Sequence, residues 1–356
     1  MKNKILFFLF AFVIFGKMTA FCEIVPVENK KEWKAQMFLA DQIKGIGLMD
    51  SFQEDGVNCS YIYDDALAAM AHMAMGNNGL AQEILATIAS EIKPTLWGLP
   101  SESYSFSDLS GTGQGKAYSG NVAWILQAFN VYQKTTGSRE FYAYQKKLAD
   151  CLLRVQDPRD GALWGSAYDA WKSVEHNLVA YVALRNFGKL NGMGTYMVQA
   201  EKIKYFLQGP AAWNGQRFNR GPYDYTEVLD VQALGVLILG NRYLNALNWA
   251  EVNLQTAKQQ GGTFISGFDF NDDLDTIWFE GTLQMALAYS LKMQNPVIAN
   301  FFYNQALTAV QSDGSLLLAT NPGTASDDWI LQPWRAVAPT CWLIFYSRKF
   351  NPVIIY

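Results

Sequence analysis

The sequence has 356 residues, of which 50% are hydrophobic and 14% aromatic, and its formal net charge is −4. Its 28 basic residues are outnumbered by 32 acidic ones, so no basic face is expected to replace phosphate counterions, and nucleic acid is not expected as a partner. No run of Pro, Ser or charge divides the chain, and we predict a single domain over residues 23–356.

The first 22 residues are typical of a secretory signal peptide. Two lysines precede an apolar stretch from Ile5 to Phe15, and cleavage is expected after Ala20 or Cys22. The stretch is short for a membrane span, so no stable membrane insertion of the mature chain is expected, and an uncleaved anchor is the alternative. Cleavage would leave 25 basic against 32 acidic residues, a net charge of −7, in a secreted or periplasmic protein.

Apolar residues recur at helical spacing through most of the mature chain, whereas alternating strand patterns are scarce. Start and stop signals predict twelve helices and an all-α protein. The predicted helices span residues 28–43, 61–75, 78–92, 119–136, 138–156, 173–189, 193–208, 229–240, 242–258, 277–293, 295–311 and 336–349.

These predicted helices alternate between two kinds. The even-numbered ones are small or apolar on nearly all faces, as in Ala66–Ala71 and Val231–Leu237, whereas the odd-numbered ones are amphipathic, as in Glu140–Leu148. A helix that is apolar all round must be buried, and an amphipathic helix can lie outside it. The alternation therefore predicts an (α/α)6 toroid, with six inner helices ringed by six outer helices.

Long loops lead from each outer helix to the next inner helix, and they should all emerge on one face of the toroid. Long loops commonly carry function. These loops contain Trp97, Trp164, Trp171, Trp213, Trp329 and Trp334, together with many Gly and Asp residues. Aromatic planes can stack on the C–H faces of sugar rings while polar side chains bind the hydroxyls, so the expected cleft suits carbohydrate.

The junctions between loops and inner helices resemble the six-hairpin glycosidase-like superfamily of (α/α)6 barrels, and in particular a bacterial set of secreted or enzyme-attached domains. The motifs are Tyr63-Asp64-Asp65-Ala66, Ser173-Val174-Glu175-His176-Asn177, Asp230-Val231-Gln232, the segment from Asp275 to Ala286, and the segment from Ala338 to Phe345 with Asn351-Pro352. The resemblance covers almost all of the mature chain. It implies the toroid fold, and its activity classes include hydrolases, lyases and epimerases.

Three carboxylates are candidate acid and base residues. Asp64 and Asp65 open one inner helix, where adjacent residues diverge by about 100°, so only one of them can point down the barrel axis. The resembling proteins carry Tyr-Asp-x-Ala there, which favours Asp64. Glu175 lies at the equivalent place on another inner helix. Glu280 follows two aromatic residues that would desolvate it and raise its pKa, and a glycosidase needs one protonated carboxyl and one carboxylate.

Nine further residues at these junctions are candidate substrate-binding residues: Tyr63, Asp65, Trp171, His176, Asn177, Asp230, Trp278, Trp334 and Arg335. Every inner helix should begin on the same face, so the carboxylates at residues 64, 175, 230 and 280 are expected to converge on one cavity. Arg335 would either bind the carboxylate of an acidic sugar or pair with a neighbouring Asp.

No metal and no cofactor is predicted. Residues 269, 271, 273, 275 and 280 match positions 1, 3, 5, 7 and 12 of a calcium-binding loop, but Leu274 occupies the position that requires Gly. The leading hypothesis is a secreted glycoside hydrolase-like protein that acts on an oligosaccharide or polysaccharide. The alternatives are a non-catalytic carbohydrate-binding toroid, a polysaccharide lyase, or a sugar epimerase; epimerases on this fold resemble one another in using paired histidines, and here only His72 and His176 exist, on different helices.

Overall fold

The computed structural model describes residues 27–43, 47–93, 99–105, 110–111, 116–224, 226–326 and 329–356. The predicted signal peptide and Trp97 lie outside the described residues. Among the described helices, none is long and apolar enough to cross a membrane.

Twelve α-helices make up most of the described chain. They are α2 (Val27–Gln42), α3 (Ile62–Ala74), α4 (Asn78–Ser90), α5 (Ser119–Thr136), α6 (Tyr142–Arg154), α7 (Val174–Leu190), α8 (Gly194–Gln208), α9 (Asp230–Leu239), α10 (Asn245–Asn253), α11 (Phe279–Ala288), α12 (Pro296–Leu307) and α13 (Val337–Ser347). A short 3₁₀ helix (Asn241–Tyr243) precedes α10, and a π-helix (Tyr289–Met293) follows α11.

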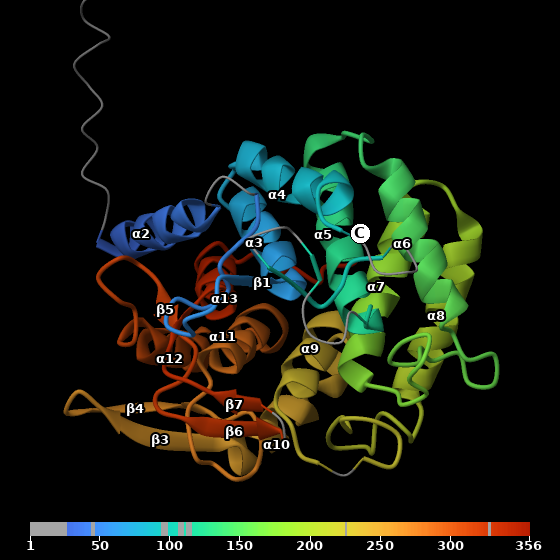
Figure 1. The fold of residues 1–356 in the computed structure, drawn as a ribbon. Helices are drawn as coiled ribbons and strands as arrows, with labels where there is room; N and C mark the ends of the chain where they lie inside the picture. The colour runs from blue at the N-terminus through green and yellow to red at the C-terminus, as the bar shows by residue number, and fades with distance from the viewer. Residues whose placement is uncertain are drawn as a thin grey trace, which may run out of the picture.

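Six of these helices close a ring (Figure 1). Helix α3 packs on α5, α5 on α7, α7 on α9, α9 on α11, α11 on α13, and α13 returns to α3. The other six lie outside: α2 contacts α13, α4 contacts α3 and α5, α6 contacts α5 and α7, α8 contacts α7, α10 contacts α9, and α12 contacts α11. The predicted all-α (α/α)6 toroid is confirmed, because the helices that are apolar all round are the ones that form the inner ring.

Small residues set the close packing of the inner ring. Residues Ala66–Ala71 of α3 are fully buried. On α9, a Cβ at Gly235 would lie 2.3 Å from the ring of Phe218, and on α7 a Cβ at Gly188 would lie 2.8 Å from the side chain of Met197 on α8. Glycine at these positions lets neighbouring elements approach the helix backbone, since interiors are packed to nearly crystalline density.

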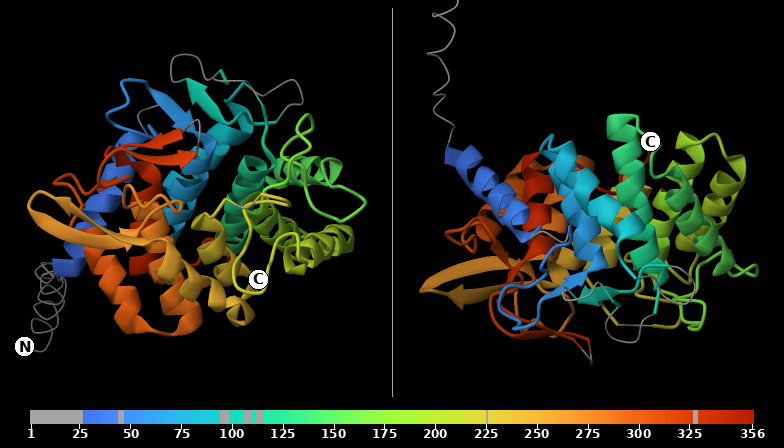
Figure 2. Two further views of the ribbon diagram at one scale, coloured as in Figure 1. Left: turned by 90° about the horizontal axis from the view of Figure 1, so that it is seen from below. Right: turned by 45° about the horizontal axis from the view of Figure 1, so that its top comes forward.

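Four short antiparallel strand pairs lie in the segments that connect the helices of the toroid. They are β1 (Cys59–Tyr61) with β2 (Ser103–Ser105), β3 (Gln255–Gln260) with β4 (Thr263–Phe268), β5 (Leu316–Leu317) with β8 (Arg335–Ala336), and β6 (Gly323–Ser326) with β7 (Trp329–Leu331). The left panel of Figure 2 looks at the end of the toroid where strand arrows gather. Strands β1 and β8 lead directly into inner helices α3 and α13, so these pairs form the rim from which the inner helices begin.

The prediction of a helix over residues 242–258 is wrong at its end. Helix α10 stops at Asn253, and the following residues form strand β3, whose register places Gln255 opposite Phe268. Gly261 and Gly262 connect β3 to β4 with φ angles of 57° and 83°. Two consecutive positive φ angles are typical of a tight hairpin turn, and this turn overrides the weak helical pattern before it.

The C-terminal segment closes the end of the toroid opposite the strands (Figure 1). Gln127 of α5 donates to the carbonyl of Pro352 at 2.9 Å. Asn186 of α7 donates to the carbonyl of Ile354 at 2.8 Å and accepts from the N–H of Tyr356 at 3.0 Å. The open end is therefore the one where the inner helices begin.

Deleting residues 353–356 should destabilise the fold without altering the open end. The deletion removes the buried Val353 and leaves the fully buried Asn186 without the Ile354 carbonyl and the Tyr356 N–H. An orphaned buried polar group costs about 1–3 kcal/mol, so the free energy of unfolding should fall by at least that amount. Urea denaturation measures the change, and an unchanged midpoint would show that the segment does not hold the ring together.

Candidate active site

All six inner helices begin around one cavity of 440 Å³. First-turn residues of each helix line it: Asp64 of α3, Asn121 of α5, Glu175 of α7, Asp230 of α9, Glu280 of α11 and Ala338 of α13. The four carboxylates expected to converge therefore line one cavity. The rest of the lining is largely aromatic, from Phe52, Tyr61, Tyr63, Trp124, Phe270, Trp278 and Trp329.

A larger groove of 950 Å³ adjoins this cavity. The two spaces share Glu175, Asp230 and Phe270 in their linings. The groove lies between the loop before α7 and the loop before α9, and Trp171 and Tyr223 line it. Cavity and groove therefore form one cleft across the open end, with Glu175 and Asp230 at the boundary.

Glu280 lines the cavity and is 5% exposed. The Tyr63 hydroxyl donates to its Oε1 at 2.5 Å, and Gln284 Nε2 donates to the same oxygen at 3.2 Å. Burial raises the pKa of Glu280 to about 8, against the opposing effect of the Tyr63 hydrogen bond. Both donors reach one oxygen, which leaves Oε2 available to carry a proton.

Two local features position Glu280. The preceding Trp278 is buried and lines the cavity, with its ring centroid 5.1 Å from that of Phe270. A Cβ at Gly281 would lie 2.2 Å from the Trp278 ring, so only glycine lets the ring pack against the first turn of α11. The desolvation expected from the neighbouring aromatic residues is the main cause of the raised pKa of Glu280.

Glu175 lies in the first turn of α7, which α9 separates from α11 in the inner ring, and it borders the groove. Trp124 Nε1 donates to its Oε1 at 2.9 Å, while its Oε2 lies 3.7 Å from His176 Nε2. Burial raises the pKa of Glu175 to about 7. Burial lowers the pKa of His176 to about 4, so this ring is neutral near pH 7, and its Nδ1 lies 3.1 Å from Ser119 Oγ.

Asp64 and Asp230 complete the carboxylate set. Burial raises the pKa of each to about 7, and the charge of Glu175 adds to the effect at Asp230. The charges of Asp64 and Asp230 in turn raise the pKa of Glu280. Four carboxyl groups in one desolvated space share protons near neutral pH, and such strongly raised pKa values mark candidate functional sites.

Two of the residues predicted to bind substrate are fully buried behind the cavity wall. Asp65 accepts the Met49 N–H at 2.8 Å and the Ser60 hydroxyl at 2.6 Å. Asn177 holds the backbone of Leu163, accepting its N–H at 2.6 Å and donating to its carbonyl at 3.2 Å. Each follows a cavity-facing or groove-facing residue by one or two positions, and the helical rotation turns it toward the loops. We assign both to the scaffold.

Trp334 and Arg335 also lie outside the linings of the cavity and the groove. The Trp334 ring packs near Phe52, with centroids 6.0 Å apart. Arg335 forms ion pairs with Glu54 and with Asp313, the latter at 2.9 Å. Of the two arrangements expected for Arg335, the structure contains the ion pair with neighbouring carboxylates. We therefore assign neither Trp334 nor Arg335 a role in substrate binding.

A matched pair of variants separates the scaffold role of Asp65 from the cavity position of Asp64. Asp65→Ala removes the acceptor of two buried donors and should lower the free energy of unfolding by about 1–3 kcal/mol at pH 7. Asp64→Ala should leave stability nearly unchanged and lower turnover. Urea denaturation measures the free energy of unfolding, and a rate assay on the folded fraction measures turnover. If Asp65→Ala keeps full stability but loses turnover, Asp65 is a functional residue of the site and not part of the scaffold.

Several lining residues were not singled out from the sequence. Trp124, which binds Glu175, lies one turn after the Ser119-Gly120-Asn121 junction on α5. Its position one turn into a predicted inner helix could have indicated that it lies near the cavity. Phe270 lies in the loop after β4, and nothing in its local pattern indicates that it faces the cavity. Trp329, one of the tryptophans expected in the cleft, begins strand β7 and does line the cavity.

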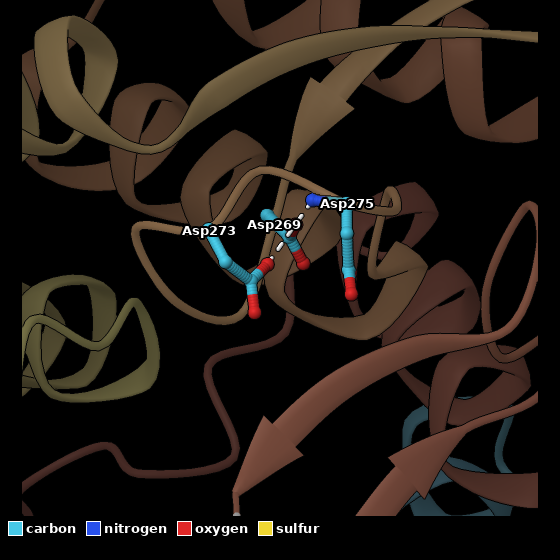
Figure 3. Close-up of side chains that lie close together, drawn as sticks. All are labelled: Asp269, Asp273 and Asp275. Carbon is cyan, nitrogen blue, oxygen red and sulfur yellow. Dashed lines mark hydrogen bonds between the residues drawn. The ribbon is translucent and has the colours of Figure 1, made fainter.

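The acidic loop before α11 brings together three carboxylates (Figure 3). Oxygen atoms of Asp269, Asp273 and Asp275 lie within 4.8 Å of one another. Leu274 adopts a φ of 55°, the conformation for which a calcium-binding loop uses Gly. However, the twelfth-position carboxylate, Glu280, bonds to Tyr63 in the cavity instead.

Hydrogen bonds explain how this loop is held. Asp269 accepts from the N–H groups of Phe270 at 2.7 Å and Thr276 at 3.0 Å. Asp273 accepts from the Asp275 N–H at 3.1 Å, and Asp275 accepts from the Thr324 N–H of β6 at 3.0 Å. We therefore assign the cluster to fastening the loop to strand β6.

No family model and no curated protein matches the sequence. Solved structures with the same fold include a glycosidase variant in complex with glucose, at 10% identity and a TM-score of 0.71 over 91% of this chain and 97% of that chain. A D-mannose isomerase is 11% identical, with a TM-score of 0.68 over 92% of this chain and 96% of that chain. An α-mannanase from Bacteroides thetaiotaomicron is 8% identical, with a TM-score of 0.57 over 90% and 95%.

These likenesses extend over nearly the whole of each chain, while sequence identity is low. What they share with this protein is the fold. The chain therefore has the same overall fold as these solved structures, which in this protein is an (α/α)6 toroid.

Proposed function

We propose that this protein is a secreted glycoside hydrolase that cleaves an oligosaccharide or polysaccharide, with Glu280 as its general acid and Glu175 as its base or nucleophile. The observation that carries the proposal is the convergence of four carboxyl groups, from four inner helices, on one aromatic-lined cavity. Glycoside hydrolysis needs two carboxyl groups in different protonation states on either side of the scissile bond.

Glu280 is assigned as the general acid. A pKa of about 8 keeps its carboxyl protonated at neutral pH. Hydrogen bonds from Tyr63 and Gln284 fix Oε1, so that Oε2 can present a proton to the glycosidic oxygen. Asp64 and Asp230 support this role because their negative charge disfavours ionisation of Glu280.

Glu175 is assigned as the base or nucleophile. Trp124 donates a hydrogen bond that stabilises the ionised form of Glu175 and opposes the increase in its pKa that burial causes. Its side chain is 19% exposed and borders the open groove, through which water can reach it. A carboxylate in contact with water and with the cavity meets the requirement for the second catalytic group.

The aromatic lining supports a sugar as the substrate. Tyr61, Trp278 and Trp329 offer ring surfaces in the cavity, and Asn121 and Glu102 offer hydrogen-bonding groups. This combination of stacking planes with a few polar groups is how proteins hold carbohydrate rings. Two of the solved structures that share the fold, the D-mannose isomerase and the α-mannanase, are named for activities on carbohydrates.

Sugar epimerisation is the second candidate, because His176 borders the groove next to Glu175. The other histidine of the chain, His72, is buried in α3 and lines neither the cavity nor the groove. Two histidines therefore do not face one substrate, and the carboxylates favour hydrolysis.

A hydrolysis and glycan-binding screen of residues 23–356 tests the proposal. Release of reducing ends from a defined oligosaccharide, with no interconversion of free sugars, is the expected result. Binding without turnover would instead establish a non-catalytic carbohydrate-binding toroid, and epimer formation would establish the second candidate. N-terminal sequencing of the exported chain tests the proposed cleavage after Ala20 or Cys22.

A further inference from the structure

The groove beside the cavity has the size and the walls of a second part of the binding site. At 950 Å³ it is more than twice as large as the 440 Å³ cavity. The two spaces meet at Glu175 and Asp230, so a molecule bound near these carboxylates can extend into both. Pockets of about 300–1,000 Å³ suit whole small ligands, and the groove by itself is at the upper end of that range.

Trp171 provides a flat platform in this groove. Its side chain is 47% exposed, although it belongs to an ordered turn in which Gly165 N–H donates to the Trp171 carbonyl at 2.7 Å. A Cβ at Gly165 would lie 2.5 Å from the indole ring, so the glycine backbone supports one side of the ring. The ring of His176, with its centroid 5.3 Å away, further fixes the orientation of the indole.

Tyr223 lines the same groove from the loop before α9. It is 92% exposed and has a φ of 63°, a conformation that is uncommon for a residue with a side chain. Exposed aromatic residues on two separate loops thus contribute to one groove. Backbone strain of this kind is found at ligand-binding positions.

The charges that line the groove are balanced among the described residues. Lys172 pairs with Asp157 at 2.7 Å and Asp160 at 2.6 Å. Arg159 also pairs with Asp157 at 2.7 Å, and the Arg220 Nε lies 3.8 Å from Asp224. Each of these three cations already has a carboxylate partner. The neighbouring cavity is lined by the carboxyl groups of Asp64, Glu102, Glu175, Asp230 and Glu280, of which Glu175 and Asp230 also line the groove. An acidic sugar would meet no unpaired positive charge here and would be repelled by those carboxylates.

We propose that the groove binds the uncharged sugar rings of an oligosaccharide that extends beyond the cavity, with one ring stacked on Trp171. The inference rests on the proposed function and adds the substrate class, a neutral oligosaccharide that spans both spaces. The paired Lys172 and Arg220 bind sugar hydroxyls in this arrangement, and the indole supplies the apolar contact.

A chain-length series tests the inference. The probes are neutral oligosaccharides, from disaccharide to hexasaccharide, of the sugar found in the hydrolysis screen. Wild-type kcat/KM should rise with chain length until the groove is filled. Trp171→Ala should abolish that rise and lower kcat/KM for the longest probe about fivefold or more, because it removes the aromatic surface on which a sugar ring stacks. Its effect on the disaccharide should be smaller.

Tyr205→Ala is the matched control, since Tyr205 is 79% exposed on the outer helix α8 and lines neither space. A second arm uses oligomers with a uronic acid ring, which should react at least tenfold more slowly than neutral ones. Equal losses at every chain length, a loss in Tyr205→Ala as large as in Trp171→Ala, or a preference for the acidic oligomers would overturn the inference.

Failure of the proposed function gives a different result. If the wild-type protein turns over no glycan, hydrolysis is refuted, and the groove is then tested by calorimetric binding of neutral oligosaccharides, from disaccharide to hexasaccharide, of the sugar found in the glycan-binding screen. Affinity that grows with chain length and depends on Trp171 would support the groove assignment alone. Affinity that is independent of chain length, or no binding of any probe, would refute the groove assignment as well.

Discussion

Glu280→Gln and Glu175→Gln should each lower turnover of an oligosaccharide by about 10²–10⁴, because both substitutions keep the shape of the side chain and remove its acid–base function. Tyr63 and Gln284 can still contact the amide at residue 280, and Trp124 can still donate to the amide oxygen at residue 175. Binding should therefore survive in both variants. Initial rates and calorimetric affinities measure the two effects separately.

A glycosyl fluoride distinguishes the two roles. Fluoride leaves without being protonated, so Glu280→Gln should recover most of its activity on the glycosyl fluoride, while Glu175→Gln should remain inactive on both substrates. Recovery in Glu175→Gln alone would exchange the two assignments. Full activity of both variants on the oligosaccharide would remove both residues from acid–base roles and leave Asp64 and Asp230 as the candidate pair.

Glu280→Gln should also make the protein more stable than wild type at alkaline pH. The ordinary pKa of a glutamate is 4.5, and burial raises that of Glu280 to about 8 in the folded state. A carboxyl with a raised folded-state pKa contributes stability that is fully present below pH 4.5 and is lost as pH rises through about 8. The wild-type protein at pH 8.5 therefore bears the cost of a buried charge that the variant lacks.

Urea denaturation at pH 5 and pH 8.5 measures this effect. At pH 8.5 the free energy of unfolding of Glu280→Gln should exceed that of wild type by about 1–3 kcal/mol, and the difference should shrink or reverse at pH 5. The solvent-exposed Glu201, on the outer helix α8, provides the control Glu201→Gln, which should show no such dependence. A difference that is the same at both pH values would contradict the raised pKa of Glu280.

Much of the helical architecture follows from local patterns. Helix α5 begins and ends at the residues predicted, and α3, α7 and α8 differ from prediction by one residue at most at each end. These segments are readable because apolar periodicity and end signals act within a few residues. The same locality explains the error after α10, where the Gly261-Gly262 turn and its pairing with β4 outweigh helical spacing.

The candidate site was only partly readable. Asp64 and Asp65 are neighbours of the same type at the start of one helix, and local sequence cannot say which one faces the axis. The contacts of Asp65 with Met49 and Ser60 decide it, because they turn that carboxylate into the wall. Arg335 is similar: its partners Glu54 and Asp313 are distant in sequence and take it away from the mouth.

The sequence by itself determined the all-α class, the alternation of inner and outer helices and the face on which their acidic N-termini gather, since each depends on composition and spacing along the chain. Only the tertiary structure decided which side chains share the cavity, that Trp124 and Tyr63 hold the two central carboxylates, and that a groove continues from Glu175. The physical reason is that desolvation and hydrogen bonding at the site arise between residues tens to hundreds of positions apart, such as Tyr63 and Glu280, which no local pattern brings together.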